Sequence, residues 1–153
     1  MEMLNMCPNC FKQCGTGSVI CPHCGFDISG YNHKSSALPV FTTLNNQYLV
    51  GKVLGQGGFG ITYKALDTFK NQVVAIKEYM PCDYAERKGK TLCAISNNKA
   101  QKIFEHGKFS YIDEIKTLYQ FENVPGIVTI YTHFQENNTV YLVMEYLEGC
   151  SLK

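Results

Sequence analysis

The sequence lacks the features that mark exported, membrane-spanning and nucleic-acid-binding chains. Its 153 residues include 14 basic and 13 acidic residues, for a formal net charge of +1, so no excess of charge favours a nucleic acid or an anionic membrane as a partner. No apolar run reaches the ~18 residues of a spanning helix, and the amino-terminal residues do not form the basic segment and apolar core of a signal peptide. We therefore expect a cytoplasmic chain without a membrane segment.

The sequence also lacks the composition of a disordered chain. Apolar residues make up 45% and charged residues 18%, which are values typical of globular proteins. A chain of this length can hold one domain, or a small module followed by part of a larger domain. The motifs described below favour the second arrangement.

Eight cysteines in a chain without an export signal favour metal ligands or reduced thiols over disulfides. Four of them form two C-x-x-C motifs, Cys7-Pro-Asn-Cys10 and Cys21-Pro-His-Cys24. Such turns can deliver four thiolates to one tetrahedral Zn²⁺, which leaves no open coordination position and therefore indicates a structural site. The pattern resembles a short zinc ribbon. A redox pair, or Cys14 in place of one of the four ligands, remains an alternative.

The cysteine-rich segment, residues 1–28, is too short to fold around an apolar core, so we expect metal binding to supply its folding free energy. Residues 1–30 carry one lysine against two acidic residues, which argues against nucleic acid and favours a docking or regulatory role with a protein partner. Residues 29–46 mix Ser, Asn, Gly, Pro and His without regular apolar spacing, and we expect a linker there.

A glycine-rich motif follows the predicted linker. Gly55, Gly57 and Gly60 fit G-x-G-x-x-G, a pattern that dinucleotide-binding loops and protein-kinase loops share. The dinucleotide motif leads directly into a helix, whereas here residues 61–65 alternate in polarity as a strand does. A NAD-dependent oxidoreductase is therefore disfavoured. A simple β-meander, in which the glycines form a hairpin without binding a ligand, remains the alternative.

The motif is followed by Val74-Ala75-Ile76-Lys77, which matches the V-A-I-K of protein kinases in the expected order. From Gln47 to its end, the chain resembles the amino-terminal lobe of bacterial serine/threonine kinases of the eukaryotic-like type. The resemblance implies ATP as the bound nucleotide, with Mg²⁺ in the complete enzyme, and a protein substrate. One departure from the family pattern is Thr62, where a valine usually lies over the adenine.

The resemblance also implies roles for individual residues. The loop would cover the phosphates with its backbone N–H groups, Lys77 would contact the α- and β-phosphates, and Glu114 would orient Lys77. Met144 would be the gatekeeper, and the backbone of Glu145 and Leu147 would face the adenine. The full set of implied nucleotide-binding residues is Leu54, Gly55, Gln56, Gly57, Gly58, Phe59, Gly60, Thr62, Ala75, Lys77, Met144, Glu145, Leu147 and Ser151.

Helical spacing between about residues 100 and 122 predicts the helix that carries Glu114. Glu114 falls on the apolar stripe of this helix, where a carboxylate is costly unless it is paired. Glu105 and Asp113 are the alternative partners of Lys77, and Glu114 could also be a boundary residue of an amphipathic helix. Before the helix, residues 80–98 read as a loop whose basic residues form a solvated face.

The predicted fold class is α+β: an antiparallel sheet of five strands with one helix over residues 47–153, preceded by the zinc ribbon. The kinase template also requires H-R-D-x-x-x-x-N and D-F-G, and neither occurs in the 153 residues. We therefore expect an amino-terminal fragment of a serine/threonine kinase, which is not catalytic by itself. The alternative is a stand-alone, non-catalytic binding or regulatory module.

Overall fold

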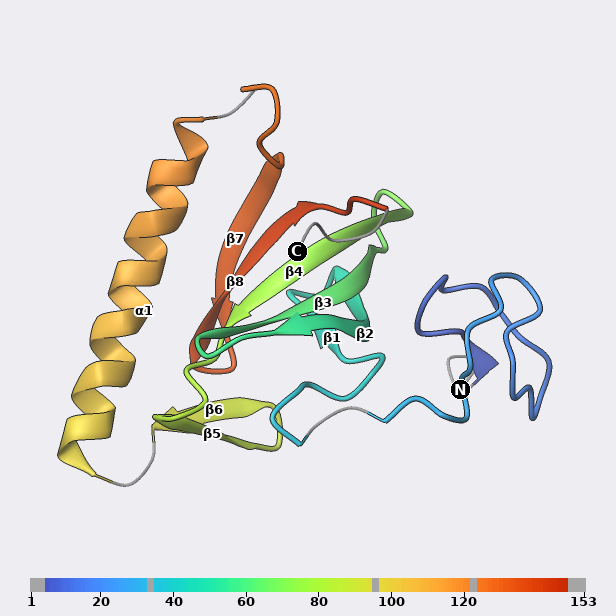
Figure 1. The fold of residues 1–153 in the computed structure, drawn as a ribbon, viewed down its shortest axis with the longest axis horizontal. Coiled ribbons are helices and arrows are strands. Elements are labelled where there is room, and N and C mark those ends of the chain that lie inside the picture. The colour runs from blue at the N-terminus through green and yellow to red at the C-terminus, as the bar shows by residue number, and fades with distance from the viewer. Residues whose placement is uncertain (1–4, 33–34, 95–96, 122–123, 149–153) are drawn as a thin grey trace.

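The computed structural model describes residues 5–32, 35–94, 97–121 and 124–148. Six strands form one antiparallel sheet in the order β1-β2-β3-β4-β8-β7, and β5 and β6 form a separate hairpin (Figure 1). The elements are β1 (Thr43–Leu44), β2 (Tyr48–Gln56), β3 (Gly60–Asp67), β4 (Gln72–Tyr79), β5 (Ala85–Lys88), β6 (Thr91–Ala94), α1 (Asn98–Tyr119), β7 (Ile130–Glu136) and β8 (Thr139–Glu145). The predicted α+β class is confirmed.

The sheet has one strand more than predicted. Strand β1 pairs with the start of β2 through Thr43–Leu49 and Leu44–Tyr48. The turn between them consists of Asn45, Asn46 and Gln47, and both asparagines have positive φ, a left-handed backbone that asparagine adopts more readily than most residues. The linker prediction therefore does not hold for its second half, where Ala37, Leu38 and Leu44 are buried in the core of the sheet.

The predicted loop over residues 80–98 contains the hairpin β5–β6. Lys88 pairs with Thr91 around Gly89, whose φ of 63° suits glycine at the first position of a tight hairpin turn. The prediction of a solvated basic face was wrong for Arg87, because its side chain is only 3% exposed and ion-pairs with Glu78 of β4.

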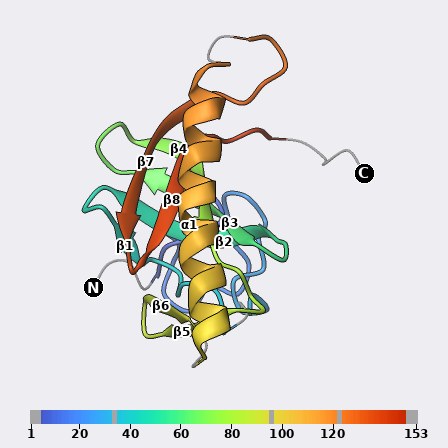
Figure 2. The same ribbon diagram turned by 90° about the vertical axis from the view of Figure 1, so that its left-hand side faces the viewer.

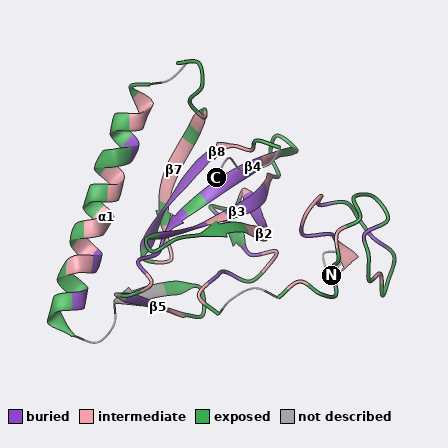
Figure 3. Ribbon diagram, in the orientation of Figure 1, coloured by how far each residue is buried: buried purple, intermediate pink, exposed green. Residues whose placement is uncertain are grey.

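Helix α1 lies along one side of the sheet, which is plain when the molecule is turned by 90° (Figure 2). The side chain of Asn97 caps its start by accepting a hydrogen bond from the N–H of Ala100 at 2.7 Å. Its buried residues are Ala100, Phe104 and Ile115, and Phe104 and Ile115 pack with residues of the sheet. Exposed and half-buried residues make up the rest of the helix (Figure 3). Among the described residues, no helix is long and apolar enough to cross a membrane.

Candidate nucleotide and metal sites

The glycine-rich loop connects β2 to β3 as a tight turn. The N–H of Gly57 donates to the carbonyl oxygen of Gly60 at 2.9 Å, and Phe59 at the tip is 72% exposed. A Cβ at Gly60 would lie under 3.0 Å from the Glu78 carbonyl oxygen, so this position requires glycine. The N–H of Met80 donates to the Phe59 carbonyl oxygen at 2.9 Å. The loop is therefore held against the chain that follows β4.

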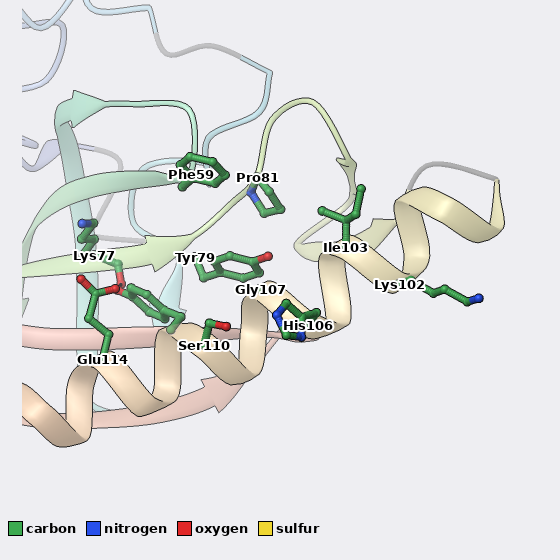
Figure 4. Close-up of a pocket in the computed structure, with 11 residues that line it drawn as sticks. Phe59, Lys77, Tyr79, Pro81, Lys102, Ile103, His106, Gly107, Ser110 and Glu114 are labelled. Atoms are coloured by element: carbon green, nitrogen blue, oxygen red, sulfur yellow. Dashed lines mark hydrogen bonds between the residues drawn. The ribbon is translucent and has the colours of Figure 1, made fainter.

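Lys77 and Glu114 line the same hollow, of about 840 Å³, between the glycine-rich loop, β4 and α1. Figure 4 shows them at the same end of this hollow, and Phe59 also lines it. Both side chains are exposed, and the ion pairs within 4.0 Å among the described residues do not include them. The structure thus brings the two predicted partners to one cavity without direct pairing.

The alternative partners of Lys77 lie elsewhere. Glu105 pairs with Lys108 at 3.5 Å, and neither Glu105 nor Asp113 lines the hollow. Tyr111 holds α1 against β4, because its hydroxyl donates to the carbonyl oxygen of Lys77 at 3.1 Å. Of the three carboxylates considered from the sequence, Glu114 alone faces the lysine across this space.

The residues predicted to enclose the adenine lie on neighbouring strands. Ala75 of β4 pairs with Met144 of β8, and Thr62 of β3 pairs with Lys77. Cross-strand partners share a face of the sheet, and residues two apart along a strand do so as well. These four side chains therefore share one face, which we call the cleft face.

The remaining predicted contacts are less enclosed. Leu54 is 39% and Leu147 61% exposed, while the N–H of Glu145 donates to the carbonyl oxygen of Thr129 at 2.9 Å. Gly55, Gln56, Gly57 and Gly58 are exposed along the loop. Ser151 lies outside the described residues.

A buried carboxylate behind Lys77 was missed by the sequence interpretation. Glu78 is fully buried and accepts hydrogen bonds from the hydroxyls of Tyr63 at 2.9 Å and Tyr141 at 2.6 Å. Strand alternation places Glu78 on the face opposite Lys77. An acidic residue at a core-facing position of this strand was the signal by which the sequence could have indicated a buried carboxylate. The ion pair with Arg87 compensates the charge.

The Glu78 cluster also ties the segment before β1 to the sheet. The Nε of Arg87 donates to the carbonyl oxygen of Ser36 at 2.8 Å, and the N–H of Leu38 donates to the Tyr63 hydroxyl at 2.9 Å. Burial opposes the charge on Arg87, but the Glu78 carboxylate outweighs this effect and raises the pKa of Arg87. Burial first, and then the Glu78 charge, raises the pKa of Tyr63 as well.

The two C-x-x-C motifs come together in space. The sulfur atoms of Cys7, Cys10, Cys21 and Cys24 all lie within 4.8 Å of one another. The Sγ–Sγ distances are 3.7 Å for Cys7–Cys24 and 3.6 Å for Cys10–Cys21, close to the ~3.8 Å edge of a tetrahedron with metal–sulfur bonds of about 2.3 Å. The cluster can therefore hold a metal ion.

Each C-x-x-C turn directs a backbone N–H to its first sulfur. Asn9 N–H donates to Cys7 and His23 N–H donates to Cys21, each at 3.4 Å. Burial acts to raise the pKa of Cys21, but the N–H groups of Cys24 and His23 and the neighbouring thiols outweigh it and lower the pKa to about 6. The second motif therefore favours the thiolate that metal coordination requires, whereas burial raises the pKa of Cys7 and raises that of Cys10 to about 12.

The alternative ligand Cys14, and His23 within the second C-x-x-C motif, lie outside the four-sulfur cluster. Cys14 contacts Cys21 at 3.6 Å but does not belong to the group of mutually close ligands. The Nε2 of His23 lies 3.1 Å from the carbonyl oxygen of Gln13. The structure therefore favours Cys7, Cys10, Cys21 and Cys24 as the ligand set.

Comparisons with known proteins agree with this geometry. Residues 48–153 match the family model of the protein kinase domain. The chain is 34% identical over 109 residues to serine/threonine-protein kinase D of Synechocystis sp., covering 70% of this chain and 19% of that protein. It is 26% identical over 150 residues to serine/threonine-protein kinase B of the same organism, covering 95% of this chain and 21% of that protein.

A solved structure is also similar to this chain. The apo form of PpkA-294 superimposes with a TM-score of 0.70 at 32% sequence identity, over 75% of this chain and 40% of that one. The chain thus spans about a fifth of the length of these two curated relatives and less than half of the solved one.

Proposed function

Because the chain belongs to the protein kinase family, we propose that residues 47–153 form the ATP-binding lobe of a serine/threonine kinase. In the complete protein, this lobe would hold ATP and Mg²⁺ for phosphoryl transfer to serine or threonine of a protein substrate. The observation that supports this most directly is the meeting of Phe59, Lys77 and Glu114 around one hollow. These three residues come from the loop, the strand and the helix that the kinase mechanism requires.

The roles of the residues follow from the chemistry of phosphate binding. Backbone N–H groups of the loop would cover the phosphates, and the ammonium of Lys77 would contact the α- and β-phosphates. Glu114 would orient Lys77, and the cleft face with Ala75 and Met144 would enclose the adenine. The catalytic base and the Mg²⁺ ligands of the kinase mechanism are not among these 153 residues, so we expect no phosphoryl transfer from this chain by itself.

We test the nucleotide assignment with Lys77→Met in the complete protein. Binding of an ATP analogue, measured by calorimetry, should weaken at least about tenfold, because a charged contact to phosphate is worth roughly 1.5–3 kcal/mol. Lys99→Met is the matched control, since Lys99 is exposed on α1 and does not line the hollow. Unchanged affinity in Lys77→Met would contradict the proposal.

We also infer that the cysteine cluster is a structural Zn²⁺ site. Four sulfur atoms near tetrahedral spacing supply every ligand that zinc takes in such sites and leave none for a substrate. Among the described residues, these four cysteines are free thiols, as a set of zinc ligands requires. Zinc analysis of the purified chain should give one ion per chain. The Cys21→Ser variant tests the ligand set, because its zinc content should fall when one of the four sulfur ligands is removed.

A further inference from the structure

The module that carries the cysteine cluster contacts the edge of β2. Strand β1 pairs only with residues 48 and 49 of β2, so the rest of this edge needs other partners. The N–H of Lys52 donates to the carbonyl oxygen of Pro8 in the module at 3.0 Å. The N–H of Val53 donates at 2.8 Å to the hydroxyl of Tyr31, which follows the module and packs against Phe26 of the module with ring centroids 5.7 Å apart. A shift in register between Val50 and Val53 marks this part of β2 as irregular, and Pro8 and Tyr31 accept the N–H groups of Lys52 and Val53 there.

Gly51 and Phe11 make the closest part of this contact. A Cβ on Gly51 would lie under 3.0 Å from both the Pro8 carbonyl oxygen and the ring of Phe11. Phe11 has φ of 63° and is only 8% exposed. The equivalent position after the second C-x-x-C motif is Gly25, with φ of 78°. A phenylalanine in this costly conformation indicates that packing of its ring against β2 compensates the strain.

Asn9 connects the sulfur cluster to the next strand. Its Nδ2 donates to the sulfur of Cys24 at 3.4 Å, and its Oδ1 accepts a hydrogen bond from Nζ of Lys64 at 3.1 Å. Lys64 of β3 is only 7% exposed and pairs with Ala75, so it lies on the cleft face. Its ammonium also lies 4.7 Å from the ring centroid of Tyr146, which follows β8.

We propose that metal binding at the cysteine cluster fixes the module on β2, and that the module thereby supports the strand leading into the glycine-rich loop. The inference rests on the proposed metal site. The module is too small to keep its fold without the metal, and Pro8, Asn9 and Phe11 belong to the turn that the first C-x-x-C motif forms. Loss of the metal therefore removes the partners of Lys52 and Val53 and uncovers Gly51.

Amide hydrogen exchange of the 153-residue chain, followed by NMR, tests this inference. Exchange at Lys52 and Val53 should be slow with Zn²⁺ and roughly two- to tenfold faster after chelation, the change expected for loss of one ordinary hydrogen bond. Amides of Ile76 and Val143, which pair in the centre of the sheet, report whether the lobe itself stays folded and should change little.

Two variants separate docking from metal binding. Phe11→Gly relaxes the backbone of the first turn and removes the packed ring, while Gly51→Ala places a Cβ into the contact from the side of the lobe. Both should bind one Zn²⁺ and show fast exchange at Lys52 and Val53 even when loaded. Gly15→Ala is the control, because its Cβ would meet only the Ser18 hydroxyl at 3.5 Å, and its exchange should match the parent.

The outcomes distinguish the two proposals. A chain that binds no Zn²⁺ overturns the metal site and the inference built on it. One that binds Zn²⁺ but shows the same exchange at Lys52 and Val53 with and without the metal, and in both docking variants, overturns only the docking inference. Fast exchange restricted to the metal-free chain and the two docking variants supports both.

Discussion

At the scale of single residues, Glu78 shows how the strand that carries Lys77 is anchored. Consecutive residues of β4 point to opposite faces, so the exposed lysine has a fully buried carboxylate beside it. Two tyrosine hydroxyls and one guanidinium saturate that carboxylate. A buried charge with complete partners specifies one arrangement of the strands around it, whereas loss of one partner leaves an uncompensated charge.

Arg87→Met should therefore destabilise the protein strongly. We expect a loss of about 3–5 kcal/mol in the free energy of unfolding, because Glu78 would remain buried without its cation. Urea denaturation followed by circular dichroism measures this loss. The neighbouring Lys88→Met is the control: its ion pair with Glu86 is 67% and 53% exposed and should contribute less than about 0.5 kcal/mol. Equal stability of the two variants would refute the structural role of the buried pair.

At the scale of elements, the packing of α1 on β4 depends on a glycine within the helix. Gly107 faces Tyr79, and a Cβ there would lie under 3.0 Å from the tyrosine hydroxyl. That hydroxyl donates to the carbonyl oxygen of Phe104 at 3.1 Å, and the two rings are 5.7 Å apart. The glycine thus permits the close approach that brings α1, with Glu114, near Lys77.

Gly107→Ala should destabilise the protein although alanine is the better helix former. The gain in helix propensity is about 1 kcal/mol, whereas overpacking against Tyr79 costs roughly 1–3 kcal/mol. The midpoint of thermal unfolding should therefore fall. Removing the tyrosine hydroxyl in Gly107→Ala/Tyr79→Phe should relieve part of the loss. If the double variant lost more stability than the two single variants lose in sum, the contact would be contradicted.

At the scale of the whole molecule, the core contains or is flanked by several tyrosines that are buried or half-buried. Burial, followed by the charge of a nearby carboxylate, raises the pKa of Tyr63, Tyr111 and Tyr141 above the ordinary value of 10.0. Burial, followed by the Glu105 charge, raises the pKa of Tyr79 to about 12. The folded state therefore keeps these protons at a pH where the unfolded chain releases them.

Stability should consequently fall in alkali. The contribution of these tyrosines is fully present below pH 10 and is lost as the pH rises from 10 towards their folded values. The urea midpoint should be lower at about pH 11 than at about pH 9, and tyrosinate absorbance should appear together with unfolding. Tyr141→Phe removes one of these groups and should flatten the decline; a midpoint that does not change between the two values would contradict the prediction.

Much of the arrangement could be predicted from the sequence because it rests on local patterns. The glycine spacing, the alternation of β3 and β4 and the period of α1 each repeat over several residues. The dipeptide Asn137-Asn138 is likewise a local hairpin signal, and both residues have positive φ in the turn between β7 and β8. The hairpin β5–β6 was missed because its charged residues obscured the turn signal of Gly89, and β1 because two residues are too few to show a period.

The sequence by itself determined the family, the glycine-rich loop with its lysine and the pairing of the two C-x-x-C motifs, because each depends on residue identity at short fixed spacing. Only the tertiary structure decided which carboxylate of α1 faces Lys77, how Glu78 is compensated by Arg87, and that the cysteine module lies on β2 at Gly51. These contacts join residues far apart in the chain, and packing geometry, which no local pattern encodes, selects them. The glycine-rich loop can thus be recognised from the local sequence, whereas contacts with residues distant in the chain hold it in place.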